Sequence, residues 1–244
     1  MCLIAVAWRT SGRRPLIIAA NRDESHARPT EPAHWWPDAP RILAGRDVLA
    51  GGTWLGVDAA GRFAAVTNLR GAEPFVGKRS RGALVADFLR GDADAERYAA
   101  QIASDASEYG AFNLLVCDGD ALWFVGTGAA PRELPRGVHA VSNVEPGVDW
   151  PKVRTARERL AAVVDDALPE DAMFDLLAER SPRVDGYDDR QISPFQLDPV
   201  WGTRSSTVVI AEAAGRVRFV ERSFDAAGER VGEARFEFTA SRAA

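Results

Sequence analysis

Short runs of apolar residues, most of them rich in Leu, Ile and Val, recur along the 244-residue chain. Many of them come in pairs separated by a brief polar stretch, which is the pattern of β-hairpins. The clearest pair, 112–117 and 121–126, flanks Asp118-Gly119-Asp120. Comparable runs, which we expect to be strands, lie at 2–8, 15–21, 53–57, 62–69, 137–143, 206–212, 216–224 and 233–239. Hairpins join antiparallel strands, so the sequence predicts antiparallel sheets.

Apolar residues at helical spacing predict helices between these groups of strands. We expect them at 81–89, 93–106, 151–168 and 170–180. Ser80 and Asp92 are suited to cap the first two, and Pro151 suits the first turn of the third. Residues 182–203 show no periodicity, and we expect a surface loop near a cleft there. Several predicted strands are apolar on both faces, so each face of their sheet must be buried against another layer. The expected fold class is therefore α+β, with helices outside the sheets.

Composition adds limits to this picture. The chain has no linker-like stretch, so we expect one domain over 1–244. A formal net charge of −5 argues against nucleic-acid binding. No apolar stretch approaches the ~20 residues of a membrane span, and the N-terminus lacks the basic region of a signal peptide. Two cysteines fit a reducing compartment, so we expect a cytoplasmic protein. The sequence does not determine its oligomeric state.

Familiar catalytic motifs are absent from the sequence. The stretch GAEPFVGKRS has the wrong spacing for a phosphate loop, and no Gly-x-Ser-x-Gly elbow is present. The three histidines do not have zinc-ligand spacing, so we expect no metal site. If the protein is an enzyme, its general base is expected to come from a group other than histidine.

Cys2, directly behind Met1, offers such a group. If Met1 is removed, Cys2 carries a thiol and a free α-amine, and an α-amine titrates near pH 8. The nucleophile then carries its own general base, and we expect a thiol pKa below the ordinary ~8.5. The alternative is an inert buried thiol, which is our expectation for Cys117.

Polar residues at strand ends are candidate partners of Cys2. Hairpin pairing would bring Asn21, Arg22 and Asp23 beside residue 2. Neighbours on an extended strand point to opposite faces, so only one of Arg22 and Asp23 is expected to face Cys2 unless the strand bends. Asn21 shares its face with Asp23 and could replace the arginine. The alternatives are a turn-forming Asn21 and a surface ion pair of Arg22 with Asp23.

Further candidates lie later in the chain. Asn68 and Asn143 end apolar strands, and Arg204 stands just before another strand. The candidate substrate contacts are Trp35, Trp36, Trp54, Arg70 and Arg81. Two adjacent tryptophans cannot both be buried on a strand, so one of that pair is expected to line a ligand cleft. Trp54 could instead be a core residue, and Arg81 could simply begin a helix.

Several of these stretches together resemble one family. They are MCLIAVAW, LIIAANRDE, GGTWLGVDAAGRFAAVTNLR, SRGALVADFL, VSNVEPGVDWPKV and WGTRSSTVVI. In this order they are similar to the NRDE family, which is the family of the transport and Golgi organisation 2 protein. That family is in turn similar to N-terminal-nucleophile (Ntn) hydrolases of the choloylglycine hydrolase and penicillin V acylase type. The resemblance implies a four-layer αββα fold.

The resemblance also implies roles for the candidate residues. Cys2 would be the nucleophile, with Arg22 and Asp23 as the charged pair beside it. Asn68 and Asn143 would be oxyanion or amine-binding groups, and the distal arginine would be Arg204. In the acylases the arginine and the aspartate are spaced more widely than Arg22 and Asp23 are.

Two functions of different classes remain open from the sequence. The first is a cysteine hydrolase that cleaves an amide or (thio)ester of a hydrophobic acyl group without a cofactor. The second is a protein that binds and carries haem, an acyl-lipid or acyl-coenzyme A on the same fold. For haem, Cys2 or a histidine such as His34 would be the axial ligand.

Overall fold

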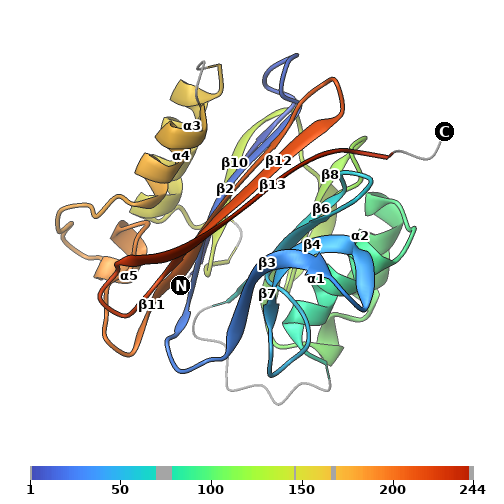
Figure 1. Ribbon diagram of the computed structural model, residues 1–244. Coiled ribbons are helices and arrows are strands. Elements are labelled where there is room, and N and C mark those ends of the chain that lie inside the picture. The colour runs from blue at the N-terminus through green and yellow to red at the C-terminus, as the bar shows by residue number, and fades with distance from the viewer. Residues whose placement is uncertain (1, 70–78, 146, 166–168, 242–244) are drawn as a thin grey trace. The chain divides into compact units, whose positions relative to one another are not determined.

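The computed structural model describes residues 2–69, 79–145, 147–165 and 169–241, which form two compact units (Figure 1). Unit 1 comprises Met1–Arg28, Arg136–Ser142 and Gly147–Phe238. Unit 2 comprises Pro29–Pro135, Asn143–Pro146 and Thr239–Ala244. The chain therefore passes from one unit to the other several times, and the expectation of a single domain over 1–244 stays a prediction.

Unit 1 contains a six-stranded antiparallel sheet. Across the sheet the strands are β10 (Gly137–Ser142), β1 (Leu3–Trp8), β2 (Leu16–Ser25), β11 (Trp201–Ala211), β12 (Arg216–Phe224) and β13 (Arg230–Thr239). Helix α3 (Pro151–Val163) packs on β1 and β10, and α4 (Pro169–Leu177) packs on β2 and β11. A one-turn helix, α5 (Asp189–Ile192), precedes β11. Every residue of β1 is buried, as its unbroken apolar run requires.

Unit 2 contains a seven-stranded antiparallel sheet. In order its strands are β3 (Thr30–Trp36), β4 (Ala39–Asp47), β5 (Leu55–Asp58), β6 (Phe63–Asn68), β7 (Phe112–Cys117), β8 (Leu122–Gly126) and β9 (Ala129–Glu133). Between β6 and β7 lie α1 (Arg81–Arg90), α2 (Ala95–Ser104) and the short η1 (Ala106–Glu108). Spatial order in this sheet follows sequence order, so each strand pairs with its chain neighbour.

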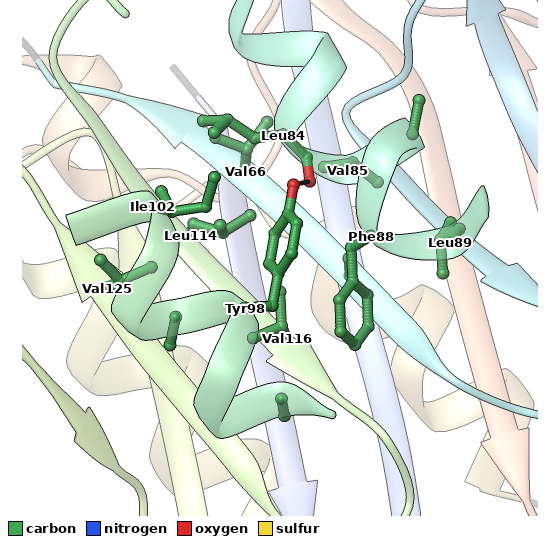
Figure 2. Packing of buried hydrophobic residues seen from close by; sticks show 14 of the residues in the cluster. Val66, Leu84, Val85, Phe88, Leu89, Tyr98, Ile102, Leu114, Val116 and Val125 are labelled. Atoms are coloured by element: carbon green, nitrogen blue, oxygen red, sulfur yellow. Dashed lines mark hydrogen bonds between the residues drawn. The ribbon is translucent and has the colours of Figure 1, made fainter. Parts of the chain in front are cut away.

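The core of unit 2 forms where α1 and α2 pack on this sheet (Figure 2). Phe88 of α1 and Tyr98 of α2 meet with ring centroids 5.1 Å apart. The Tyr98 hydroxyl donates to the carbonyl of Leu84 at 2.7 Å, so its one polar atom is satisfied within the core. Burial raises the pKa of Tyr98. The helices are therefore fixed to the sheet largely by apolar packing, and the Tyr98 hydroxyl joins α2 to α1.

The structure confirms two antiparallel sheets with helices, and it contains every strand and helix predicted from the sequence. The stacking of the parts into four layers stays a prediction. Ser80 caps α1 as expected, by accepting from the backbone N–H of Gly82. The expected cap of α2 is wrong: Asp94 accepts from the N–H of Arg97, whereas Asp92 accepts from Arg41.

Strands β3, β4 and β9 and helix α5 are absent from the sequence prediction. Prolines interrupt the alternation of 29–40, and 129–133 contains a proline followed by two charged residues, so neither stretch shows the apolar period of a strand. The 182–203 stretch is not all loop, because Asp188 and Gln191 form a capping box that starts α5. Among the described residues, no helix is long and apolar enough to cross a membrane.

Candidate functional site

Cys2 lies directly before β1, next to the end of β2. Leu3 pairs with Asn21 in the β1–β2 ladder, so the register places Cys2 beside Arg22. The Cys2 thiol lies 3.8 Å from the backbone carbonyl oxygen of Asp23 and donates to it. From the other side, the Ser142 hydroxyl of β10 donates to the Cys2 carbonyl at 2.6 Å. Both neighbouring strands therefore hold Cys2 in place.

Arg22 and Asp23 are both buried, at 4% exposure each. Across from them on β11 the register shifts, because Thr203 pairs with Asp23 while Ser205 pairs with Arg22. Arg204 is thus the extra residue of a β-bulge, a feature that bends a strand and redirects side chains. Both charged groups act on the Cys2 thiol. The bulge therefore lies directly opposite the two adjacent charged residues of β2.

The Asp23 carboxylate is fixed by β11. The Thr203 hydroxyl donates to Asp23 Oδ1 at 2.6 Å. The same hydroxyl oxygen accepts from the backbone N–H of Gln196 at 2.9 Å, which sets the direction of its own proton. Arg22 lies 3.8 Å from the carboxylate of Glu24. Because Arg22 and Asp23 are both buried, the alternative of a surface ion pair between them does not apply.

The Cys2 thiol does not have the low pKa expected from the sequence. Burial raises the pKa of this thiol above its ordinary value, and the Asp23 carboxylate acts in the same direction. Arg22 lowers the pKa, but its effect is smaller than that of burial. In this environment the neutral thiol is favoured, which is opposite to the expected direction. The low pKa expected for a chain that begins at Cys2 stays a prediction.

Asn21 cannot replace an arginine beside Cys2. Its side-chain amide donates to the carbonyls of Leu177 in α4 and Pro194, at 2.8 and 3.0 Å. Its side-chain oxygen accepts from the Ser206 hydroxyl at 2.6 Å. Because Asn21 points toward α4, it ties the sheet to the helix, and that structural task corrects the catalytic role given to it above.

Arg204 binds backbone carbonyls. Its guanidinium donates to the carbonyls of Ser25, His26 and Arg28, at 2.9, 3.2 and 3.2 Å. These contacts fix the path of the chain as it leaves β2, close to the Asp23 carboxylate. The catalytic role that the family resemblance implies for Arg204 stays a prediction.

The two asparagines predicted to act together lie together in unit 2. The side-chain amide of Asn143 donates to the Asn68 carbonyl at 2.7 Å. Asn143 is buried and its side-chain oxygen has no hydrogen-bond partner among the described residues, whereas the Asn68 side chain is exposed. Their part in binding an oxyanion stays a prediction.

The tryptophans proposed as substrate contacts separate into two kinds. Trp36 is fully buried, and its indole N–H donates to the Ala44 carbonyl, so it is a core residue and not a ligand contact. Trp35 is half-buried, which confirms that only one of the pair is fully buried on its strand. Trp54 is also half-buried and packs against Gly45, where an added Cβ would lie 2.3 Å from its ring.

Arg81 begins α1 and donates to the carbonyl of Ala111 at 3.2 Å. This contact gives the side chain a structural use at an electrostatically unfavourable helix start. Arg70, the last of the proposed substrate contacts, lies outside the described residues.

Sequence reasoning missed the hydroxyl residues around the site, which are Ser142, Thr203 and Ser205. Ser205 is 5% exposed, and its hydroxyl has no hydrogen-bond partner among the described residues. The run Thr203-Arg204-Ser205-Ser206-Thr207 was a usable signal, because four hydroxyl residues in one apolar strand require partners. Together, the thiol, carboxylate, guanidinium and hydroxyls of unit 1 form a polar group suited to acyl transfer to sulfur.

Comparison with known proteins gives one consistent family. The family model described as "Transport and Golgi organisation 2" matches residues 1–226. The human homolog of that name is 31% identical over 237 residues, covering 85% of this chain and 86% of the relative. The bovine homolog is 32% identical over the same length, and the Drosophila melanogaster protein is 26% identical over 258 residues, covering 87% of each chain.

Among solved structures, the chain is similar to a Caenorhabditis elegans N-acylethanolamine-hydrolyzing acid amidase ortholog. The TM-score is 0.54, and the match covers 86% of this chain and 92% of the other at 14% sequence identity. Identity this low shows a common fold alone. The fold is that of the Ntn hydrolases, as the sequence resemblance implied.

Proposed function

The chain belongs to the Transport and Golgi organisation 2 family, and we propose that its Ntn-hydrolase fold carries a cysteine hydrolase centre at Cys2. The observation that carries the proposal is the buried set around the thiol, in which Thr203 orients Asp23 while Arg22 lies beside Cys2. Burial of a carboxylate and a guanidinium next to a thiol has a cost that a purely structural strand end does not require. The likeness in fold to an amidase supports the same reading.

In this proposal the substrate is an amide or (thio)ester of a hydrophobic acyl group. Removal of Met1 frees the α-amine of Cys2, which takes the thiol proton as the sulfur attacks the carbonyl carbon. Asp23 orients the resulting ammonium, which then gives its proton to the leaving group as the scissile bond breaks. Water attacks the thioester formed on Cys2 and releases the acid. The sequence assigns the oxyanion to Asn68 and Asn143, and a cytoplasmic location remains part of the proposal.

A second candidate function is supported by the raised pKa of the Cys2 thiol. A thiol kept neutral by burial is a poor nucleophile, so the fold could instead bind haem, an acyl-lipid or acyl-coenzyme A without turnover. His34 is an unsuitable haem ligand, because its ring nitrogens contact the Pro32 carbonyl at 2.8 Å and the Glu31 carboxylate at 3.6 Å. The carrier reading therefore does not depend on His34.

The test uses intact-mass spectrometry on protein that begins at Cys2. The protein is incubated with lauroyl p-nitroanilide and with a lauroyl thioester, and release of the leaving group is followed in parallel. We expect one lauroyl group on the wild type, none on Cys2→Ala and one on Cys117→Ala, which is the matched control. Asp23→Asn should lower turnover about 100-fold or more while ligand affinity changes little.

One combined result would reject the hydrolase in favour of the carrier. No donor would give Cys2-dependent acylation, while haem or acyl-coenzyme A would bind tightly and equally to the wild type and Cys2→Ala. Equal turnover by the wild type and Asp23→Asn would instead remove the aspartate from the mechanism.

A further inference from the structure

A concave site lies in unit 1, at the end of the sheet away from Cys2. It is a pocket of about 490 Å³ between the β1–β2 turn, the β11–β12 turn and the first residue of α4. Cys2 comes just before β1, whereas the pocket begins after it, so the six-residue length of that strand separates the two. The pocket is therefore not part of the Cys2 site.

Guanidinium groups dominate the wall of this pocket. Arg13 and Arg14 come from the β1–β2 turn, and Arg216 and Arg218 come from β12. Glu212 supplies the one carboxylate among the described residues that line it. The whole chain has a formal net charge of −5, so this concentration of positive charge is local and not a consequence of composition.

Acidic neighbours compensate the two arginines of β12. Arg216 donates to Glu212 at 2.8 Å, and the guanidinium of Arg218 lies 3.8 Å from Glu170 and 3.7 Å from Glu237. The Arg13 side chain is different, because it is exposed and makes no ion pair with any described residue. Arg13 is therefore the cation of the pocket that a ligand can engage without displacing an internal partner.

The two turns that carry these charges are tied to each other. The backbone N–H of Ala213 donates to the Arg13 carbonyl at 2.9 Å. The Arg14 guanidinium donates to the Val164 carbonyl at 3.1 Å, just beyond α3. Figure 1 shows the two hairpin ends, blue and orange, next to each other. Because these contacts fix the loops before a ligand arrives, binding requires little ordering of backbone.

We propose that this pocket binds a small molecule through a phosphate group, with Arg13 as the principal contact and Arg14 and Arg218 alongside. The planar fork of a guanidinium matches two phosphate oxygens, and such charge-assisted hydrogen bonds are among the strongest in proteins. The volume falls within the range of small-molecule sites. Ile210 and Pro169, both buried, add apolar surface to the lining, which suits a ligand with a carbon skeleton next to its phosphate.

The experiment is a calorimetric titration of the full chain with inorganic pyrophosphate at low salt. We expect saturable binding that weakens as salt is added. Arg13→Gln should raise the Kd about tenfold or more, and Arg13→Lys should restore part of the affinity, because it keeps the charge but loses the fork. Arg97→Gln is the matched control: it removes one exposed arginine of α2 and should leave the Kd unchanged.

Three outcomes would overturn the proposal. The first is no saturable binding of pyrophosphate by the wild type at millimolar concentration. The second is an equal loss of affinity in Arg13→Gln and Arg97→Gln, which would indicate diffuse electrostatic attraction. The third is Arg13-dependent binding of phosphatidylserine vesicles without binding of pyrophosphate, which would indicate a membrane surface. Cys2→Ala should bind pyrophosphate as the wild type does, so this test is independent of the proposed hydrolase.

Discussion

At the scale of single residues, the environment of Cys2 determines what its sulfur can do. Burial raises the pKa of the thiol, and Asp23 adds to that effect. Since the thiolate is the nucleophile, this sulfur needs a nearby positive charge or base before it can attack a carbonyl. A free α-ammonium on Cys2 would supply the charge, and its neutral form would supply the base. In the proposed centre, removal of Met1 is therefore the step that makes the Cys2 thiol reactive.

We predict that removal of Met1 lowers the apparent pKa of the Cys2 thiol further. The N-terminal ammonium already lowers this pKa, and processing moves it onto Cys2 itself. In protein that retains Met1, labelling by iodoacetamide should accelerate only as the pH rises above ~8.5, since burial raises the thiol pKa. In protein that begins at Cys2, the same acceleration should occur at lower pH. The measurement is the labelling rate against pH for both forms.

Cys117 is the internal control for this labelling, because it is fully buried in β7 and should react only after unfolding. Identical pH profiles for the two forms would contradict the prediction. N-terminal sequencing that finds Met1 on most active molecules would also exclude the amine as the base.

Two adjacent serines of β11 give a second prediction at this scale. Ser206 donates to Asn21, whereas the Ser205 hydroxyl is buried without a partner among the described residues. Ser206→Ala should lower the free energy of unfolding by about 1–3 kcal/mol, because it leaves a buried amide oxygen unsatisfied. Ser205→Ala should be neutral or stabilising by up to ~1 kcal/mol, because it removes an unsatisfied hydroxyl.

Urea denaturation of both serine variants measures the difference. The two residues share one strand and one substitution, so the comparison isolates the hydrogen bond. A loss of stability in Ser205→Ala as large as that in Ser206→Ala would show that the Ser205 hydroxyl has a partner after all.

At the scale of elements, the bulge in β11 arranges the site. Arg204 is inserted where Thr203 pairs with Asp23 and Ser205 pairs with Arg22. Arg204 also binds the carbonyls that follow β2, so the bulge and the end of β2 support each other. The bulge therefore lies opposite the charged pair, and its extra residue fixes the path of the chain that follows β2.

We predict that Thr203→Val destabilises unit 1, because it keeps the side-chain volume but removes the donor to Asp23 and the acceptor for Gln196. A hydrogen bond to a charged group is worth about 1.5–3 kcal/mol, and the loss should fall in or above that range. Thr53→Val is the matched control in unit 2, because buried Thr53 donates to a neutral carbonyl, that of Leu55. Its cost should be about 1 kcal/mol. Equal costs in chemical denaturation would show that the Asp23 carboxylate gains nothing from Thr203.

At the scale of the whole molecule, the two units differ in how local their strand pairing is. In unit 2 the strand order follows the chain. In unit 1, β1 pairs with β10, and β2 pairs with β11, so that Asn21 bonds a residue 185 positions away. Closing long loops has an entropic cost that must be met before such contacts form.

We therefore predict that the amides of β5 to β8 gain protection before those of β1, β2 and β11 during refolding. The measurement is pulse-labelling hydrogen exchange after dilution from urea, read by mass spectrometry of peptides. Peptides from β12 and β13 are a useful internal comparison, because these strands are neighbours in the chain and in the sheet of unit 1. Simultaneous protection of both sheets would contradict the predicted order.

The sequence by itself determined most strands and helices, because their apolar period and turn residues act locally. It also determined the family, through residues spread along the whole chain. Only the tertiary structure decided which polar side chains face Cys2. The bond of Thr203 to Asp23 spans 180 positions, and the bulge at Arg204 overrides the alternation that a strand sequence implies. Burial of the thiol, which reverses its expected pKa, is likewise a property of packing and not of the residues nearby in sequence.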